Sequence, residues 1–597
     1  MNDTATNNFL WAWRLIDGLA AAGVGRVVIS PGSRSTPLAL AALRHPAMTS
    51  KVVVDERSAA FVALGMAKAE AKPAMLIATS GSAVANWFPA VVEADMGRTP
   101  LLLLSADRPA ELQDCGANQT MNQIGLFGDH VRAFHQLPPA ESESSWLAGL
   151  ADRAVAASLG PLPGPVHLNI PLREPLTPVR LPELPAAGRA RRRLSATLQA
   201  DPESVALLEK LMAAGSGAIV CGPDDLGDAA RAAIARSARR LGIPVFADFL
   251  SSLRCGIPET PAILAHPDQV ARHAPAADWV LRLGGAPITS GVNDWLERCR
   301  GRPQMVVAAH PRLADPEALA THVLQADPAS LLERLAGAAA PDHWLERFLG
   351  LDRAASAAAA STCADDRAFE GSLLRALLSS LPAETPIFLA NSLTVRAADW
   401  FAGRTPQSLR LFGNRGVSGI DGNLSTACGI AAALGHAVAI VGDLAFLHDL
   451  NTLAAGRDCR VTVVLVDNGG GGIFDHLAQA SLPEFERGWL TPQFFDPVPA
   501  AQAFGLSCIR AEGVRETVAA VRAVLGAPRM HIIHVPVDRA FSLARIREFH
   551  SANVHECLTP QLIKAAVCPP LPQPLSPEGR GELRESLRDF HINKELQ

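Results

Sequence analysis

Short apolar segments alternate with longer amphipathic segments along most of the chain. In the first third, residues 26–30, 52–54, 75–79 and 101–105 are the predicted strands, and residues 59–71 form a predicted alanine-rich helix. Short, fully apolar strands between helices are typical of parallel sheets covered on both faces. The pattern predicts an α/β fold built on doubly wound parallel sheets.

The same alternation returns twice more. The predicted strands of the second unit are 218–221, 245–247, 280–283 and 305–308, and those of the third are 387–390, 437–441, 461–466 and 531–535. A chain of 597 residues exceeds what one hydrophobic core usually supports. We therefore expect three α/β domains.

Two stretches without strand patterns suggest where these domains divide. Residues 182–201 are rich in Pro, Ala and Arg and are predicted to be a linker, and an alanine-rich stretch near 351–366 precedes the third unit. The end of the chain is proline-rich and then charged, so we expect the tail to be partly disordered. The predicted divisions are 1–182, 202–350, 367–540 and the tail, 541–597.

Composition excludes several classes of protein. Hydrophobic residues make up 48% and charged residues 19%, a globular balance, and the net charge of −5 gives no reason to expect nucleic-acid or lipid partners. No uncharged apolar run approaches the roughly 20 residues of a membrane span. The ten cysteines show no C-x-x-C or zinc spacing, and the N-terminus has no secretory pattern. A cytoplasmic location is the expectation.

Two glycine-rich loops follow predicted strands of the third unit. Gly442-Asp443 follows AVAIV, and Asn468 with four glycines follows VTVVLV. Ligands bind at the carboxyl ends of parallel strands, where an aspartate and an asparagine supply hard oxygens that suit Mg²⁺. Glycines let the backbone approach a phosphate. A lone Gly-Asp is usually only a turn, but two such loops favour a diphosphate held through a divalent cation.

Glu56 lies where an early apolar strand gives way to a helix. Such an acid is most often solvated and simply favoured by the helix dipole. The functional alternative is a sheltered carboxylate that exchanges a proton with a heterocycle.

Four further loops carry arginines beside turn residues. They contain Ser33-Arg34, Arg108, Ser392 with Arg396, and Arg415. Guanidinium groups bind carboxylates in bidentate fashion, so this set suits a substrate with several carboxylates. Unrelated surface arginines are an equally plausible explanation in so arginine-rich a chain.

Other common motifs do not apply. The segment Gly215-Ser216-Gly217 precedes a predicted strand, whereas a dinucleotide-binding loop follows one. The sequence contains no serine nucleophile elbow, P-loop or H-E-x-x-H motif.

Taken together, these residues resemble the thiamine-diphosphate decarboxylase and synthase superfamily, and within it the family of 2-succinyl-5-enolpyruvyl-6-hydroxy-3-cyclohexene-1-carboxylate synthases of menaquinone biosynthesis. The resemblance spans residues 30 to about 475. The matching stretches are SPGSRSTPLALA, TSGSAVANWFPAVVEA, ADRPAELQDCGANQTMNQIGLFG, NSLTVRAADW, GNRGVSGIDGNLSTACG, GDLAFLHDLNTL and DNGGGGIFD.

The resemblance implies a transferase chemistry. Glu56 is expected to bind the pyrimidine ring of thiamine diphosphate and to favour the tautomer that accepts the thiazolium proton. The cofactor acts as the electron sink. 2-Oxoglutarate is expected to lose CO₂, and its succinyl-semialdehyde fragment to add to isochorismate. A homodimer or a dimer of dimers is implied, because sites of this superfamily form between subunits.

The resemblance also implies individual roles. The metal ligands, for Mg²⁺ or Mn²⁺, are expected to be Asp443, Asn468 and the carbonyl of Gly470. The expected substrate contacts are Ser33, Arg34, Arg108, Gln119, Ser392, Arg396 and Arg415. The expected cofactor contacts besides Glu56 are Thr79, Ser80, Gly81, Ile420, Gly442, Asp443, Leu444, Ala445, Gly470, Gly471 and Ile473.

Two departures and two rival functions stay open. Some members carry a basic residue in the middle-domain segment that here reads 287–293 and has none, and Asp467 could compete with Asn468 for the metal. An acetolactate-synthase-like carboligase is the nearest rival, although that group usually has fewer carboxylate-binding arginines. The other rival is a cofactor-binding regulatory protein without activity, against which the retention of Glu56, Asp443 and Asn468 argues.

Overall fold

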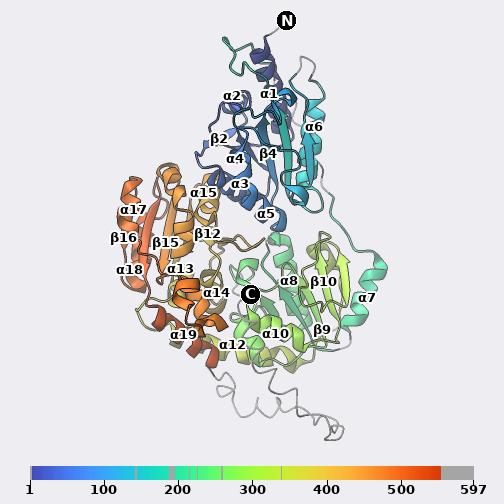
Figure 1. Ribbon diagram of the computed structural model, residues 1–597. Helices are drawn as coiled ribbons and strands as arrows, with labels where there is room; N and C mark the ends of the chain where they lie inside the picture. The colour runs from blue at the N-terminus through green and yellow to red at the C-terminus, as the bar shows by residue number, and fades with distance from the viewer. Residues whose placement is uncertain are drawn as a thin grey trace.

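The computed structural model describes three parallel sheets, each covered by helices and each with its own part of the core (Figure 1). The described residues are 3–552, apart from 141–143, 187, 189–193, 195, 214, 225, 257–259 and 338. The three-domain α/β architecture predicted from the sequence is confirmed.

The N-terminal sheet has the strand order β2-β1-β3-β4-β6-β5, with all pairs parallel. Its strands are β1 (Arg26–Ile29), β2 (Thr49–Val52), β3 (Ala74–Ala78), β4 (Leu101–Asp107), β5 (Ala133–Gln136) and β6 (Pro165–Pro171). Its helices are α1 (Thr4–Ala21), α2 (Thr36–Arg44), α3 (Glu56–Glu70), α4 (Ser82–Ala85), α5 (Phe88–Met96) and α6 (Leu147–Leu159). Helices α1, α2 and α6 share one core with the sheet, and α3 and α5 share another.

The middle sheet has the order β11-β10-β9-β7-β8 and is also parallel. Its strands are β7 (Gly217–Cys221), β8 (Val245–Ala247), β9 (Trp279–Leu283), β10 (Gln304–Ala308) and β11 (His322–Gln325). Its helices are α7 (Pro202–Met212), α8 (Gly227–Leu241), α9 (Pro267–His273), α10 (Ser290–Arg298) and α11 (Pro328–Arg334), followed by α12 (Asp342–Thr362).

The C-terminal sheet repeats the plan of the first, with the order β13-β12-β14-β15-β17-β16. Its strands are β12 (Pro386–Leu389), β13 (Arg410–Phe412), β14 (Ala437–Gly442), β15 (Val461–Asp467), β16 (Ser507–Arg510) and β17 (His531–Pro536). Its helices are α13 (Glu370–Ser380), α14 (Leu393–Phe401), α15 (Asn423–Leu434), α16 (Asp443–His448), α17 (Pro497–Ala503), α18 (Val514–Val524) and α19 (Arg539–Ser551).

Two parts of the predicted organisation differ from the structure. The stretch 351–366 lies mostly within α12, which buries Phe348 in the middle core and Ala359 in the C-terminal core. The predicted tail begins too early, because residues 541–551 belong to α19 and bury Phe549. The rest of the tail lies outside the described residues. Described residues within 182–201 form no helix or strand. Across the described chain, no helix is long and apolar enough to cross a membrane.

Helices α3 and α15 join the N-terminal and C-terminal domains by a backbone contact. A Cβ atom placed on Gly65 would lie 2.0 Å from the carbonyl oxygen of Thr426 and 3.0 Å from the Cα of Gly429. The reverse holds for Gly429, whose Cβ would lie 2.0 Å from the Val62 carbonyl oxygen. Only glycine permits this approach, so the glycines set how closely the two helices pack.

A Gly65→Ala substitution is therefore expected to lower the free energy of unfolding by about 1–3 kcal/mol, because overpacking forces the two backbones apart. Thermal denaturation measures the effect. Gly149→Ala is the matched control, since Gly149 lies inside α6 and the Cβ would meet only the flexible end of Arg153, at 3.5 Å. Equal melting temperatures for the two variants would contradict the role of the contact.

Candidate active site

The two glycine loops of the C-terminal domain lie side by side, because β14 and β15 are neighbouring parallel strands. Asp443 is the first residue of α16, directly after β14. Its Oδ2 accepts a hydrogen bond from the Gly470 amide at 2.5 Å, and its Oδ1 accepts one from the Leu444 amide at 2.9 Å. The sequence prediction that these loops form one site is consistent with this contact.

The Asn468 side chain has a defined orientation and a free acceptor. Its Nδ2 donates to Oε1 of Glu370 at 2.8 Å, so its Oδ1 faces the other way. That Oδ1 is buried and has no hydrogen-bond partner in the described structure. A buried acceptor without a partner is costly, and a cation bound there would satisfy it. Glu370, buried at the start of α13, was not foreseen from the sequence, and we see no local signal that could have found it.

Asp467 has a different environment. Its Oδ2 lies 2.8 Å from Nε2 of His534, and its Oδ1 accepts from the Gly469 amide at 3.1 Å. The hydrogen bond from His534 lowers the pKa of Asp467, whereas burial and the nearby Asp467 charge raise the pKa of Asp443 to about 7. The Asp467 carboxylate is held by the imidazole of His534, whereas Asn468 Oδ1 is buried without a partner in the described part of the chain, so Asn468 is the better candidate ligand.

This donor set fits a small divalent cation. It offers the Asp443 carboxylate, the Asn468 amide oxygen and the Gly470 carbonyl, which accepts one hydrogen bond from the Gly472 amide and keeps a second lone pair. The backbone path needs glycine: Gly470 has a φ of +134°, and a Cβ there would lie 2.2 Å from the Leu490 carbonyl oxygen. Beside Gly442 the space is open, so a phosphate could reach the backbone before α16.

Glu56 is the first residue of α3 and is half-buried. The preceding Asp55 caps the helix by accepting from the Ser58 amide at 3.0 Å, and Asn451 donates to the other Asp55 oxygen at 2.8 Å. No hydrogen bond or ion pair of the Glu56 side chain occurs within the described residues. Its position is thus fixed by its neighbours while its carboxylate stays available to a ligand.

The predicted substrate residues of the N-terminal domain come together at the carboxyl ends of β1, β3 and β4. Arg34 and Arg108 are both buried, and burial together with the charge of Arg34 lowers the pKa of Arg108. Arg108 donates to the Ser80 hydroxyl, and Gln119 Nε2 donates to the Ser80 carbonyl at 3.1 Å. Gly32, next to Ser33, packs on Thr79.

Ser392, Arg396 and Arg415 form a second cluster, in the C-terminal domain. Arg396 donates to the Ser392 carbonyl at 3.0 Å, and Arg415 donates to Asn391 Oδ1 at 2.6 Å. Burial, and then the charge of Arg415, lower the pKa of Arg396 to about 10. Nε of each arginine is buried without a partner in the described structure. One buried and one partly buried guanidinium group, each with an unused donor, form an environment suited to an anion.

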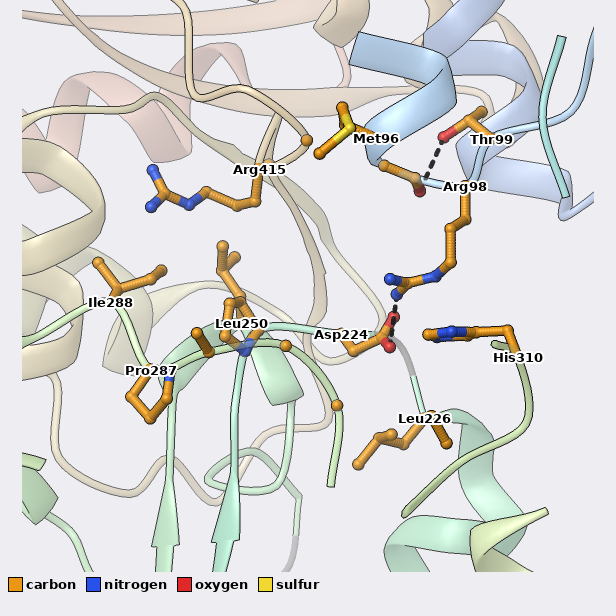
Figure 2. Close-up of a pocket in the computed structure, with 18 of the residues that line it drawn as sticks. Met96, Arg98, Thr99, Asp224, Leu226, Leu250, Pro287, Ile288, His310 and Arg415 are labelled. Carbon is orange, nitrogen blue, oxygen red and sulfur yellow. Dashed lines mark hydrogen bonds and ion pairs between the residues drawn. The ribbon is translucent and has the colours of Figure 1, made fainter. Parts of the chain in front are cut away.

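Arg396 and Arg415 line a cavity of about 1040 Å³ to which all three domains contribute. Figure 2 shows Arg415 on one side of it, near Leu250 and Ile288, and on the other side the ion pair of Arg98 and Asp224, whose atoms are 2.6 Å apart. The segment 287–293, which contains no basic residue, borders the same cavity. The lining of this cavity does not include Arg34 or Arg108, so one chain holds the two arginine clusters apart.

The remaining predicted contacts are distributed around these clusters. Ile420 precedes α15 and is 39% exposed, which is unusual for isoleucine and leaves an apolar surface for a ligand or partner. Ile473 is partly buried against the C-terminal core. Leu444 and Ala445 follow Asp443 in α16, and Gly471 donates its amide to the Leu490 carbonyl at 2.7 Å.

A half-buried acid at the start of α3, two adjacent glycine-rich loops with oxygen donors and three parallel α/β domains agree with the predicted thiamine-diphosphate-binding class, and family models confirm that class. The sequence matches three family models in order. They are "thiamine pyrophosphate enzyme, N-terminal TPP binding domain" over residues 12–126, "middle domain of thiamine pyrophosphate" over 198–389, and "thiamine pyrophosphate enzyme, C-terminal TPP binding domain" over 393–535.

Curated relatives narrow the family. A 2-succinyl-5-enolpyruvyl-6-hydroxy-3-cyclohexene-1-carboxylate synthase of Dechloromonas aromatica is 40% identical over 550 residues, covering 90% of this chain and 99% of the relative. Synthases of the same name from Halobacterium salinarum and Geobacillus kaustophilus are each 39% identical, covering 90% and 89% of this chain and 96% and 95% of the relatives. The chain belongs to this family of synthases.

Among solved structures, benzoylformate decarboxylase from Polynucleobacter necessarius superposes with a TM-score of 0.67. The alignment covers 89% of this chain and 99% of that one, at 18% sequence identity. Such a match supports the fold alone.

Proposed function

We propose that the protein decarboxylates 2-oxoglutarate and adds the remaining succinyl-semialdehyde fragment to isochorismate, using thiamine diphosphate and Mg²⁺ or Mn²⁺. The observation that carries the proposal is the free Glu56 carboxylate, held at the start of α3 in a member of this synthase family. When bound, the cofactor supplies a carbanion nucleophile and an electron sink for decarboxylation. Glu56 accepts a hydrogen bond from the pyrimidine ring and holds the tautomer that can accept the proton.

The C-terminal loops hold the phosphorylated end of the cofactor in this proposal. Asp443 Oδ, Asn468 Oδ1 and the Gly470 carbonyl bind the cation, and Glu370 keeps the Asn468 oxygen directed at it. The backbone at Gly442 and the start of α16 approach the diphosphate. The remaining residues that would contact the cofactor are Thr79, Ser80, Gly81, Ile420, Leu444, Ala445, Gly471 and Ile473.

The two arginine clusters bind the substrate carboxylates. Both proposed substrates carry two carboxylates. Arg34, Arg108 and Arg396 are buried and Arg415 is partly buried, which strengthens an ion pair with a bound carboxylate. Ser33, Gln119 and Ser392 add neutral hydrogen-bonding groups beside the arginines. The presence of four arginines favours the proposal over an acetolactate-synthase-like carboligase, whose substrates carry fewer carboxylates.

Arg415→Gln is expected to raise the KM for a substrate by about 10- to 100-fold, because a desolvated carboxylate loses its charged partner. Steady-state kinetics with each substrate varied in turn measures the effect. Arg410→Gln is the matched control, since Arg410 donates to the Ala69 carbonyl and does not line the cavity. An unchanged KM for both substrates in Arg415→Gln would remove Arg415 from the proposed pocket.

The active unit is a homodimer, or a dimer of dimers, in which each site combines the N-terminal domain of one subunit with the C-terminal domain of the other. Two features support this. Within one chain, Arg57 in the first turn of α3 donates to the carbonyl of His448, the last residue of α16. The start of α3 therefore meets the end of α16 that is farther from Asp443 and the proposed cation site. Apolar side chains beside the site are exposed, Val52 by 53% and Val54 by 79%. Light scattering after size-exclusion chromatography measures the assembly.

The partners of the protein are small molecules, with neither nucleic acid nor membrane among them, and the proposed location is the cytoplasm. The acidic net charge supports the absence of nucleic-acid partners. Eight cysteines among the described residues form no disulfide, which agrees with a reducing compartment.

The direct test supplies 2-oxoglutarate, isochorismate, thiamine diphosphate and Mg²⁺ and analyses the products by mass spectrometry. We expect CO₂ release together with the coupled product. CO₂ release without coupling would reject the synthase reaction and retain only the decarboxylation. No reaction, with cofactor bound, would favour the regulatory alternative.

A further inference from the structure

A chain of buried polar side chains lies beneath the turn at Ser80 and Gly81. Gln123 and Asn169 are each 0% exposed, and Asn169 lies on β6 between the apolar Leu168 and Ile170. Burying a primary amide costs free energy unless its polar atoms are hydrogen-bonded. The partners of these two amides therefore indicate what the site requires of them.

Asn169 uses all of its hydrogen-bonding capacity. Its Nδ2 donates to Asp107 Oδ2 at 2.7 Å and to Gln136 Oε1 at 2.8 Å. Its Oδ1 accepts from Ser105 Oγ and from Gln123 Nε2, each at 2.8 Å. A primary amide has two N–H donors and two acceptor positions, so Asn169 is saturated.

Gln123 links Asn169 to the Ser80–Gly81 turn. Its Nε2 donates to Asn169 and, at 3.3 Å, to the Ala106 carbonyl, while its Oε1 accepts from the Gly81 amide at 3.0 Å. The Asp107 oxygens accept at one end and the Gly81 amide can only donate at the other, so the two ends determine the orientation of both amides between them.

The series of hydrogen-bonded groups closes into a ring through Arg108. Asp107 Oδ1 accepts from the Arg108 amide at 2.7 Å, and the Arg108 guanidinium donates to the Ser80 hydroxyl. The result is a closed ring of contacts, here called the amide ring, that runs through Gly81, Gln123, Asn169, Asp107, Arg108 and Ser80. A displacement of the turn is thereby transmitted to Arg108 and the reverse.

We propose that Gln123 and Asn169 are positioning residues that, through the amide ring, hold the Ser80–Gly81 turn beside the cofactor and Arg108 in the geometry that binds substrate. The proposal rests on the proposed function, because Ser80, Gly81 and Arg108 are site residues only within it. Neither amide can touch a ligand, since neither is exposed. They set substrate affinity through the groups they hold.

The test uses Gln123→Glu and Asn169→Asp, which preserve shape and reverse hydrogen-bond polarity. In Gln123→Glu the carboxylate still accepts from Gly81 but its second oxygen opposes Asn169 Oδ1. In Asn169→Asp the new carboxylate opposes Asp107. We expect the KM for substrate to rise about tenfold while kcat stays within about threefold, since the ring is displaced but the reacting groups remain.

Gln304→Glu is the matched control. Gln304 is also 0% exposed and donates through Nε2, to the Leu296 carbonyl at 2.9 Å, but it lies on β10 of the middle domain. It should lower the melting temperature without changing KM. A second readout needs no turnover: hydrogen–deuterium exchange, followed by mass spectrometry of the peptide containing Ser80 and Gly81, should accelerate in the two ring variants and not in Gln304→Glu.

The outcomes separate the possible failures. If the KM values of both ring variants match that of Gln304→Glu, or if exchange at the turn is unchanged, the positioning role is overturned. If the wild-type enzyme converts neither substrate, the proposed function fails, and exchange alone still decides whether the ring holds the turn. Should Asn169→Asp not fold, Gln123→Glu decides both readouts, because it disturbs the same ring at the contact between residues 123 and 169.

Discussion

Glu56→Gln should reduce CO₂ release from 2-oxoglutarate by about 10²- to 10⁴-fold, the contribution expected of a lost proton-transferring group. The amide can still fill the space at the start of α3 but cannot hold the pyrimidine ring in its proton-accepting tautomer. Binding of thiamine diphosphate should be largely retained, because in the proposed function the C-terminal domain holds the phosphorylated end. The rate of CO₂ release measures the first effect, and calorimetric titration with thiamine diphosphate measures the second.

Glu70→Gln provides the matched control for that variant. Glu70 is the last residue of the same helix, where its carboxylate pairs with Arg26 at 2.6 Å, far from the helix start. It should leave CO₂ release unchanged. Turnover of Glu56→Gln at the wild-type rate would show that another group moves the proton.

Asp443→Asn should weaken the metal-dependent binding of thiamine diphosphate by about 100-fold or more, since even the residues that support metal ligands commonly contribute 10- to 100-fold. The amide keeps the size of the side chain but removes the charge that a divalent cation needs. Calorimetric titration with Mg²⁺ present and absent measures the loss. Binding equal to that of the wild type would exclude Asp443 as a ligand.

Two further variants sharpen this experiment. Asp496→Asn is the control, because Asp496 caps α17 by accepting from the Val498 amide at 2.9 Å and has no part in the site. Asp467→Asn tests the competing ligand. Asp467→Asn should weaken cofactor binding less than Asn468→Ala does, because the Asp467 oxygens already contact His534 and Gly469. The opposite order would assign the ligand to Asp467.

Most central strands were predictable from the sequence, and so was the edge strand β8, whereas the edge strands β5, β11, β13 and β16 were not. β14 and β15 are buried on both faces and read as continuous apolar runs. β11 and β16 lie at sheet edges and expose many of their residues, so their patterns do not differ from those of loops. β6 escaped prediction because it buries polar His167 and Asn169. The sequence places apolar residues, but pairing decides which polar ones are buried.

The candidate site follows the same division. Asp443 and Asn468 were predictable because each directly follows a strand, and neighbouring parallel strands bring their ends together. Glu370 was not, because it lies 98 positions from Asn468 and meets it only through the packing of α13. The closed ring beneath Ser80 likewise joins segments that are distant in sequence. Partnerships of this kind depend on tertiary contacts that no local pattern records.

The meeting of α3 with α15 has a consequence for how the enzyme can vary over time. Where backbone packs directly against backbone, no side chain can change rotamer or volume to compensate for a substitution nearby. Substitutions in the surrounding sequence therefore have little effect on the spacing between α3, which starts at Glu56, and α15, which follows Ile420. Adaptation to new acceptors must proceed through the loops at the strand ends, while the frame that carries them keeps its dimensions.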